Sequence, residues 1–211
     1  MHFKWHSDSS IDDCGTTCRV WISGVGPITD RTPGDFDAFV SGKDVHGATL
    51  VLDSEGGSVV NTIALGHTLR RLDITTTVGK TVAADARGRS TLSPAADCES
   101  MCAFILLGGA RRYVPQQARV LVHQIWLSGK RDRATTASYT ADELVLVEHD
   151  IGLLARYTVE MGGSIELLET ALKVPPWEPL YRLSGDEIQR MGLSTIDHLF
   201  QMSDGRVAAG Q

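Results

Sequence analysis

A short apolar run, followed by a glycine loop and a helical repeat, most constrains the fold of this chain. Residues 48–52 (ATLVL) show no polar alternation, which is typical of a strand buried on both faces. The loop 53–57 (DSEGG) ends this strand, apolar residues recur at helical spacing up to residue 71, and residues 74–78 (ITTTV) suit another strand. Strand, crossover helix and strand in this order predict a right-handed βαβ unit. The expected fold class is therefore α/β with a mainly parallel sheet.

The rest of the chain adds elements of the same kinds. We expect further strands over residues 17–22 and 118–123, a turn at 24–27, and helices over 33–40, 98–107, 140–161, 164–172 and 184–191. Thr32 is the expected N-cap of the helix at 33–40. Residues 80–97 are polar, small and turn-rich, and predict a surface excursion within the domain. The 211 residues are most simply one domain, 1–211.

Composition excludes several classes of function. Lys and Arg number 20 against 26 Asp and Glu, and no basic stripe is present, so a nucleic-acid partner is not expected. The longest unbroken apolar run, which includes residues 103–107, is far too short to span a membrane. Residues 1–8 lack the apolar stretch of a secretory leader, which leaves a cytoplasmic chain or one whose leader has been removed. Neither a metal nor a cofactor is expected.

Four cysteines form two pairs of equal spacing, Cys14 with Cys18 and Cys98 with Cys102. Neither pair has the C-x-x-C spacing of zinc or thioredoxin-like sites. Each pair is close enough for a disulfide, provided that Cys98 precedes the first helical turn, and an even count favours an oxidising compartment. Four reduced thiols packed as small apolar residues are the alternative.

Three features fall at the carboxyl ends of expected strands, where α/β folds place their sites. They are the loop 53–58, Ser100 at the start of an apolar helix, and His123. A serine beside the unpaired N–H groups of a helix start, with a histidine nearby to accept its proton, suits acyl transfer. A helix cap and a core histidine would be the purely structural interpretation of the same two residues. The G-x-S-x-G motif of α/β-hydrolases is absent, because Cys98 and Cys102 take the glycine positions.

Four ordered blocks give these features a family context. They are LVLDSEGGSV (50–59), CESMCAFILLGG (98–109), ARVLVHQ (118–124) and YRLSGDEIQRMGL (181–193). Together they resemble the Clp protease proteolytic subunit and its relatives in the crotonase-like superfamily, over residues 49–193. This resemblance implies a single-domain β-β-α superhelix with a helical handle at 140–172, and assembly into a homo-oligomer through the handle.

The resemblance also implies roles for individual residues. Ser100 matches the family's nucleophile, and His123 matches its general base. The N–H groups of Gly57 and Met101 match the oxyanion hole, and we expect Gly57 to lie against the turn at Ser100. The substrate peptide is implied to lie as an added strand along Ser58, Val59 and Val60.

The orienting acid of the family is missing from its place. Pro176 stands where the family has its catalytic aspartate, and a proline cannot orient an imidazole. Glu178 is the nearest carboxylate and the candidate third residue, while Glu169 and Asp150 are more distant candidates. If none of these carboxylates serves, a backbone carbonyl or a water molecule orients the imidazole, or the site is inactive.

Two further features distinguish the chain from the cytosolic Clp subunit. The excursion at 80–97 and the Cys-x-Ser-x-Cys core around Ser100 resemble secreted or periplasmic Clp-like proteins, which implies an extracytoplasmic location. Another relative, signal peptide peptidase A, uses a serine with a lysine base. Lys80 and Lys130 are the lysines nearest the site in sequence, but His123 fits the family position more directly.

The sequence therefore predicts a serine peptidase that hydrolyses peptide bonds in a peptide or protein substrate. Two different functions remain open. One is that of a crotonase-type enzyme acting on acyl thioesters, which usually relies on acidic residues instead of a Ser and His pair. The second is that of a catalytically degenerate peptide-binding or assembly protein, which the proline at position 176 favours.

Overall fold

The computed structural model describes residues 1–9, 18–82, 85–86, 88–127, 130, 133 and 135–199. Its main sheet has the strand order β1 (His2–Ser7), β2 (Val20–Val25), β3 (Thr49–Asp53), β4 (Thr75–Val78) and β8 (Arg111–Tyr113). β1 is antiparallel to β2, and all other neighbours in this sheet are parallel. The expected α/β class with a mainly parallel sheet is confirmed.

The remaining strands form two smaller sheets. One has the order β10 (Tyr181–Arg182), β9 (Arg119–Val122) and β7 (Asp97–Glu99), in which β7 and β9 are parallel. The other is the antiparallel pair β5 (Lys80–Val82) and β6 (Thr91–Ser93), which forms part of the predicted excursion.

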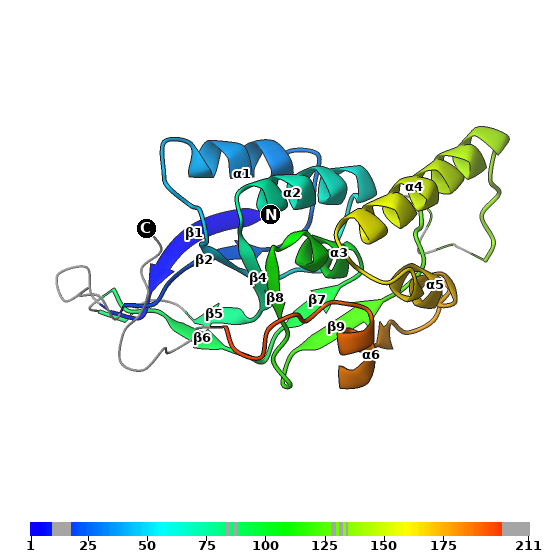
Figure 1. Ribbon diagram of the computed structural model, residues 1–211. Coiled ribbons are helices and arrows are strands. Elements are labelled where there is room, and N and C mark those ends of the chain that lie inside the picture. Colours follow the sequence, from blue (N-terminus) through cyan, green and yellow to red (C-terminus); the bar gives the residue numbers. More distant parts are fainter. Residues whose placement is uncertain are drawn as a thin grey trace.

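The helices are α1 (Thr32–Val40), α2 (Val59–Arg71), α3 (Met101–Gly108), α4 (Ala141–Glu160), α5 (Glu166–Leu172) and α6 (Gly185–Arg190). In Figure 1, α1, α2 and α3 lie on one side of the main sheet, while β5 and β6 lie on the other. Every residue of α3 is buried, because this short helix packs beneath α2 at the centre of the core. The helix that follows Ser100 is thus held on all sides.

The structure differs from the sequence predictions in three details. β1 was not predicted; it pairs with β2 and packs Phe3 against Phe36 of α1, with ring centroids 4.9 Å apart. The turn expected at 24–27 begins later, because Gly24 continues β2 beneath the side chains of Met1 and Leu50, where a Cβ would be crowded. Thr32 is the first residue of α1, and Arg31 holds the N-cap position.

The predicted helix at 98–107 is divided in the structure. Cys98 lies in β7, which pairs with β9, and the helix begins only at Met101. The apolar composition of this segment fits both a buried strand and a buried helix, so periodicity alone did not reveal the change. Ser100 is therefore the junction between a strand and a helix.

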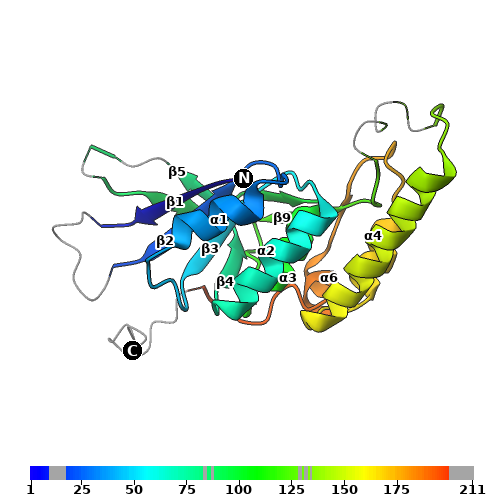
Figure 2. The same ribbon diagram turned by 90° about the horizontal axis from the view of Figure 1, so that it is seen from above.

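α4 is held to the body mainly through its second half. A capping box formed by Thr140 and Glu143 begins the helix, and its buried residues are Leu154, Tyr157 and Thr158. The Tyr157 hydroxyl donates to the Phe104 carbonyl of α3 at 2.9 Å. Figure 2 shows the first half of α4 projecting away from the sheets.

Two arginines fasten the carboxyl ends of α3 and α4 together. Arg70 and Arg112 both donate to the same three carbonyl groups, those of Leu107, Gly109 and Met161, at 2.8–3.2 Å. Burial lowers the pKa of Arg112 to about 10, and the charge of Arg70 contributes to that lowering. The negative ends of two helix dipoles stabilise this buried positive charge.

Candidate active site

Ser100 occupies a strained turn between β7 and α3. Its φ of 53° and ψ of −121° lie in a region that residues with a side chain rarely adopt, and of the described non-glycine residues only Asp73 shares the positive φ. The Ser100 N–H donates to the Leu121 carbonyl at 2.7 Å, which fixes the turn against β9. Its hydroxyl makes no hydrogen bond with any described residue. A strained strand-to-helix turn of this kind presents the serine of many hydrolases.

The register of β7 and β9 brings His123 to the same end of the sheet. Glu99 pairs with Leu121, so Ser100 and His123 both follow directly from the carboxyl ends of adjacent parallel strands. Both residues are half-buried. Because catalytic hydrogen bonds in unliganded enzymes are often long, this placement is compatible with an acid–base pair.

The glycine loop packs against the same turn through Gly56. A Cβ at Gly56 would lie 2.7 Å from the Glu99 carbonyl oxygen and 2.8 Å from both the Met101 nitrogen and the Ser100 Cβ. The Ser54 hydroxyl supports the loop, since it donates to the Gly26 carbonyl and accepts from the Gly56 N–H. Gly56 was not among the predicted site residues, although the adjacent glycines at 56 and 57 were the signal for it.

Gly57 has a different neighbour from the one expected. Its backbone is bracketed by Ile28, whose N–H donates to the Gly56 carbonyl and whose carbonyl accepts from the Ser58 N–H. A Cβ at Gly57 would therefore strike the Ile28 backbone and not the turn at Ser100. The N–H of Gly57 makes no hydrogen bond with the described residues, and the residue itself is exposed.

Two backbone donors thus lie on either side of the contact between Gly56 and Ser100. Met101 is the first residue of α3, where N–H groups have no partner within the helix. Gly57 supplies the other N–H group from the loop. An oxyanion hole requires two such donors directed at one point beside a nucleophilic oxygen.

The residues predicted to hold a peptide have mixed conformations. Ser58 is extended and caps α2, accepting hydrogen bonds from the Asn61 backbone and side chain. Val59 is buried and Val60 exposed, and both lie in the first turn of α2. Addition of a peptide strand along all three residues was expected, but the helical backbone restricts such pairing to the extended stretch that ends at Ser58.

A disulfide joins Cys98 to Cys102 across the Ser100 turn, with their Cα atoms 5.2 Å apart. This geometry is available because Cys98 lies in β7 and only Cys102 is helical. Both cysteines are fully buried. The other predicted pair includes Cys14, which lies outside the described residues.

The candidate acids lie in different surroundings. Pro176 is buried, and the segment before it runs beside the histidine, since the Gln124 N–H donates to the Val174 carbonyl at 3.0 Å. Glu178 follows in an exposed turn. Glu169 is exposed on α5, and Asp150 lies 3.8 Å from His149 on α4.

The lysines considered as possible bases are placed on other elements. Lys130 forms an ion pair with Glu143 at 2.6 Å and also donates to the Ser138 carbonyl. Lys80 lies on β5, where its charge partly opposes the rise that burial causes in the pKa of Asp53. Burial outweighs this effect and raises the pKa of Asp53, with Asp97 and Glu55 adding to the rise.

A small apolar cavity of about 170 Å³ opens beside the residues that follow His123. It lies between the chain at 124–127 and the first half of α4. Its lining includes Ile125, Trp126, Leu144 and Ile151. The Trp126 indole N–H is buried there without a hydrogen-bond partner among the described residues.

Comparison with known proteins adds no family assignment: no family model matches this chain, and no curated protein matches it significantly. Within the described residues, no cluster of three or more His, Cys, Asp or Glu is placed to hold a metal ion. None of the described helices is long and apolar enough to cross a membrane.

Proposed function

We propose that this protein is a serine peptidase of the Clp-like class, with Ser100 as nucleophile and His123 as general base. The observation that carries the proposal is the strained turn at Ser100, which precedes the first N–H of α3 at Met101 and packs against Gly56. The four sequence blocks that resemble the Clp protease subunit support the same class, and with it a crotonase-like superhelix. The mixed α/β architecture is compatible with that finer fold.

The reaction would proceed in two acyl-transfer steps. His123 takes the hydroxyl proton as the Ser100 oxygen attacks the peptide carbonyl, and the two N–H groups stabilise the oxyanion that forms. The imidazolium then gives the proton to the leaving amine, which leaves an acyl-enzyme. Water, activated by the same histidine, hydrolyses the ester and releases the carboxylic acid product.

The cavity beside residues 124–127 indicates which kind of peptide the site would accept. Its lining is apolar, and 170 Å³ suits one side chain. We infer that the peptide is cleaved next to an apolar residue that enters this cavity. The extended stretch ending at Ser58 would pair with the peptide backbone from the other side.

A catalytically inactive, peptide-binding protein is the second candidate. The observation that favours it is the buried proline at position 176, which denies the histidine an aspartate from the family position. The two candidates share the peptide site and differ in whether the Ser100 hydroxyl is reactive. Labelling of that hydroxyl therefore separates them.

The test is reaction with a fluorophosphonate probe, followed by mass spectrometry of the intact protein and its peptides. The wild-type chain should gain one probe mass on Ser100, and Ser100→Ala should gain none. Ser93→Ala, which changes a serine in β6 outside the site, should react like the wild type. His123→Ala should lose most of the reaction rate, and the double variant should be little worse than either single variant, because the two residues act as a unit. An unlabelled wild-type protein that still binds peptides would establish the second candidate.

We also propose an extracytoplasmic location. A disulfide encloses the nucleophile, and such bonds persist mainly in oxidising compartments. Alkylation of the intact protein with and without prior reduction, read by mass, tests this. Four free thiols in protein isolated under oxidising conditions would contradict it.

A further inference from the structure

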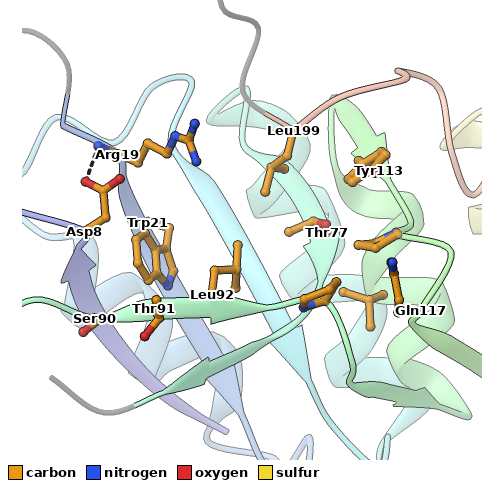
Figure 3. Close-up of a pocket in the computed structure, with 13 residues that line it drawn as sticks. Asp8, Arg19, Trp21, Thr77, Ser90, Thr91, Leu92, Tyr113, Gln117 and Leu199 are labelled. Atoms are coloured by element: carbon orange, nitrogen blue, oxygen red, sulfur yellow. Dashed lines mark hydrogen bonds between the residues drawn. The ribbon is translucent and has the colours of Figure 1, made fainter.

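A second cavity lies away from Ser100, on the face of the main sheet that the helices leave uncovered (Figure 3). Its volume is about 470 Å³, within the range of small-molecule sites. Thr77 of β4 and its paired neighbour Tyr113 of β8 form the floor, and Trp21 of β2 forms one side. Ser90 and the first two residues of β6, Thr91 and Leu92, lie beside Trp21 on that same side (Figure 3).

One hydroxyl in this cavity lacks a partner. The three consecutive threonines of β4 allow a direct comparison. Thr75 accepts from Arg111 Nε at 3.2 Å, and Thr76 donates to the Leu106 carbonyl of α3 at 2.7 Å. Thr77 points to the face opposite that of Thr76, is 1% exposed, and its Oγ1 has no hydrogen-bond partner among the described residues.

An unsatisfied buried hydroxyl destabilises a fold, whereas valine would fill the same space without that penalty. The hydroxyl therefore indicates a polar group of a ligand in the cavity. Two neighbouring polar groups are already engaged. The Trp21 indole N–H donates to Thr81 Oγ1 at 2.9 Å, and the Ser90 hydroxyl forms a hydrogen bond with His6 Nδ1 at 3.1 Å.

The remaining walls define the body of the ligand. With its N–H satisfied, Trp21 offers the cavity an apolar ring, and Tyr113 offers a second ring across from it (Figure 3). The charged pair Asp8 and Arg19 stands at one end, where the Arg19 backbone N–H donates to the Asp8 carboxylate. Aliphatic contact comes from Val78, Leu92, Pro94, Pro115 and Leu199.

We propose that this cavity binds a small neutral aromatic molecule that forms a hydrogen bond with Thr77 Oγ1. Aromatic walls favour a planar apolar body, and the buried, unpartnered hydroxyl of Thr77 accounts for one polar substituent. No charged side chain lies beside Thr77 on the described floor, so a neutral ligand is preferred over an ion. The site is separate from Ser100 and does not depend on the peptidase chemistry.

The test compares two fluorinated probes of nearly equal shape, 4-fluorophenol and 4-fluorotoluene, by ¹⁹F NMR titration of the full chain. Both should bind the wild type, with 4-fluorophenol roughly 2- to 12-fold tighter, as expected for one net hydrogen bond. Thr77→Val should remove that preference and leave 4-fluorotoluene binding unchanged. Thr91→Val, which removes an exposed hydroxyl at the edge of the cavity, is the matched control and should keep the preference.

A substitution that fills the cavity provides a second test. Leu92→Trp should reduce binding of both probes by at least tenfold, because the larger ring occupies the space between β4 and β6. Thr77→Val should fold with unchanged or higher stability, since no described hydrogen bond is lost. Absence of binding by both probes, as for a cavity that holds water only, would overturn the proposal. Equal affinities in the wild type, or binding that survives Leu92→Trp, would overturn it as well.

Discussion

The contact between Gly56 and the Ser100 turn is a close approach in the candidate active site. At this point two segments far apart in sequence meet backbone to backbone, and no side chain fits between them. Gly56 also has a φ of 87°, which favours glycine. The spacing between the two backbone N–H donors and the serine therefore depends on the absence of one carbon atom.

Gly56→Ala should consequently reduce the rate of fluorophosphonate labelling by roughly tenfold or more, because the added methyl group displaces the turn. Gly26→Ala is the matched control. Gly26 has a similar φ of 90°, but a Cβ there would meet nothing within 4 Å. It should cost only about 1 kcal/mol of folding free energy, measured by urea unfolding, and leave the labelling rate unchanged. Equal effects of the two substitutions on labelling would show that backbone strain, and not the contact, is responsible.

At the scale of elements, the ends of α3 determine its position. Its amino end carries the Ser100 turn and the disulfide, and its carboxyl end is bound by Arg70 and Arg112. Because both guanidinium groups donate to the same carbonyls, each can partly replace the other. The helix that follows Ser100 is thus fixed at two ends by two different kinds of bond.

This redundancy predicts a non-additive pair of substitutions. Arg70→Met and Arg112→Met should each destabilise the fold by about 1–3 kcal/mol, since the other arginine still serves the three carbonyls. The double variant should cost at least about 1 kcal/mol more than the sum, because the carbonyls then lose both donors. Urea unfolding of the four proteins measures this coupling. Strict additivity would mean that the two arginines act independently.

The sequence predicted those elements whose pattern and end signals agree. The βαβ unit over β3, α2 and β4 has both, and the helices α4 and α6 begin with capping boxes at Thr140 and Ser184. β1 was missed because its pairing with β2 is tertiary and its alternation is short. The helix at 98–107 was drawn too long, since β7 exists only through its pairing with β9.

The candidate site also contains residues that the sequence predicts and contacts that it does not. His123 could be named because it ends a predicted strand, and Ser100 because it lies at the start of an apolar helix, and the resemblance of the four sequence blocks gave both their expected roles. The contact made by Gly56 could not, because it depends on how the loop and the turn meet in space. The cavity that Thr77 lines was also unpredictable, since its walls come from β2, β4, β6 and β8.

At the scale of the whole molecule, the first half of α4 exposes an apolar surface. Leu144, Val145 and Leu146 are each more than half exposed on a helix that projects from the body. Exposed apolar patches of this kind mark interaction surfaces. We propose that a second copy of the chain covers it, as the resemblance to the Clp subunit implies.

Val145→Glu should therefore shift the protein towards monomers in light scattering coupled to size exclusion. Val60→Glu is the control, because Val60 is similarly exposed but lies on α2. Its mass in solution should equal that of the wild type. An unchanged mass for Val145→Glu, or a monomeric wild type, would contradict assembly through α4.

The attachment of α4 through its second half also has a consequence for dynamics. Leu154, Tyr157 and Thr158 hold the helix to the body, whereas residues 141–150 contribute none of its buried side chains. Backbone opening in that first half requires little loss of buried area, so its free energy lies far below that of global unfolding. Amide hydrogens there should exchange with solvent early and those near Tyr157 late. The lining that Leu144 and Val147 give the small cavity beside His123 therefore opens and closes with the looser half of this helix.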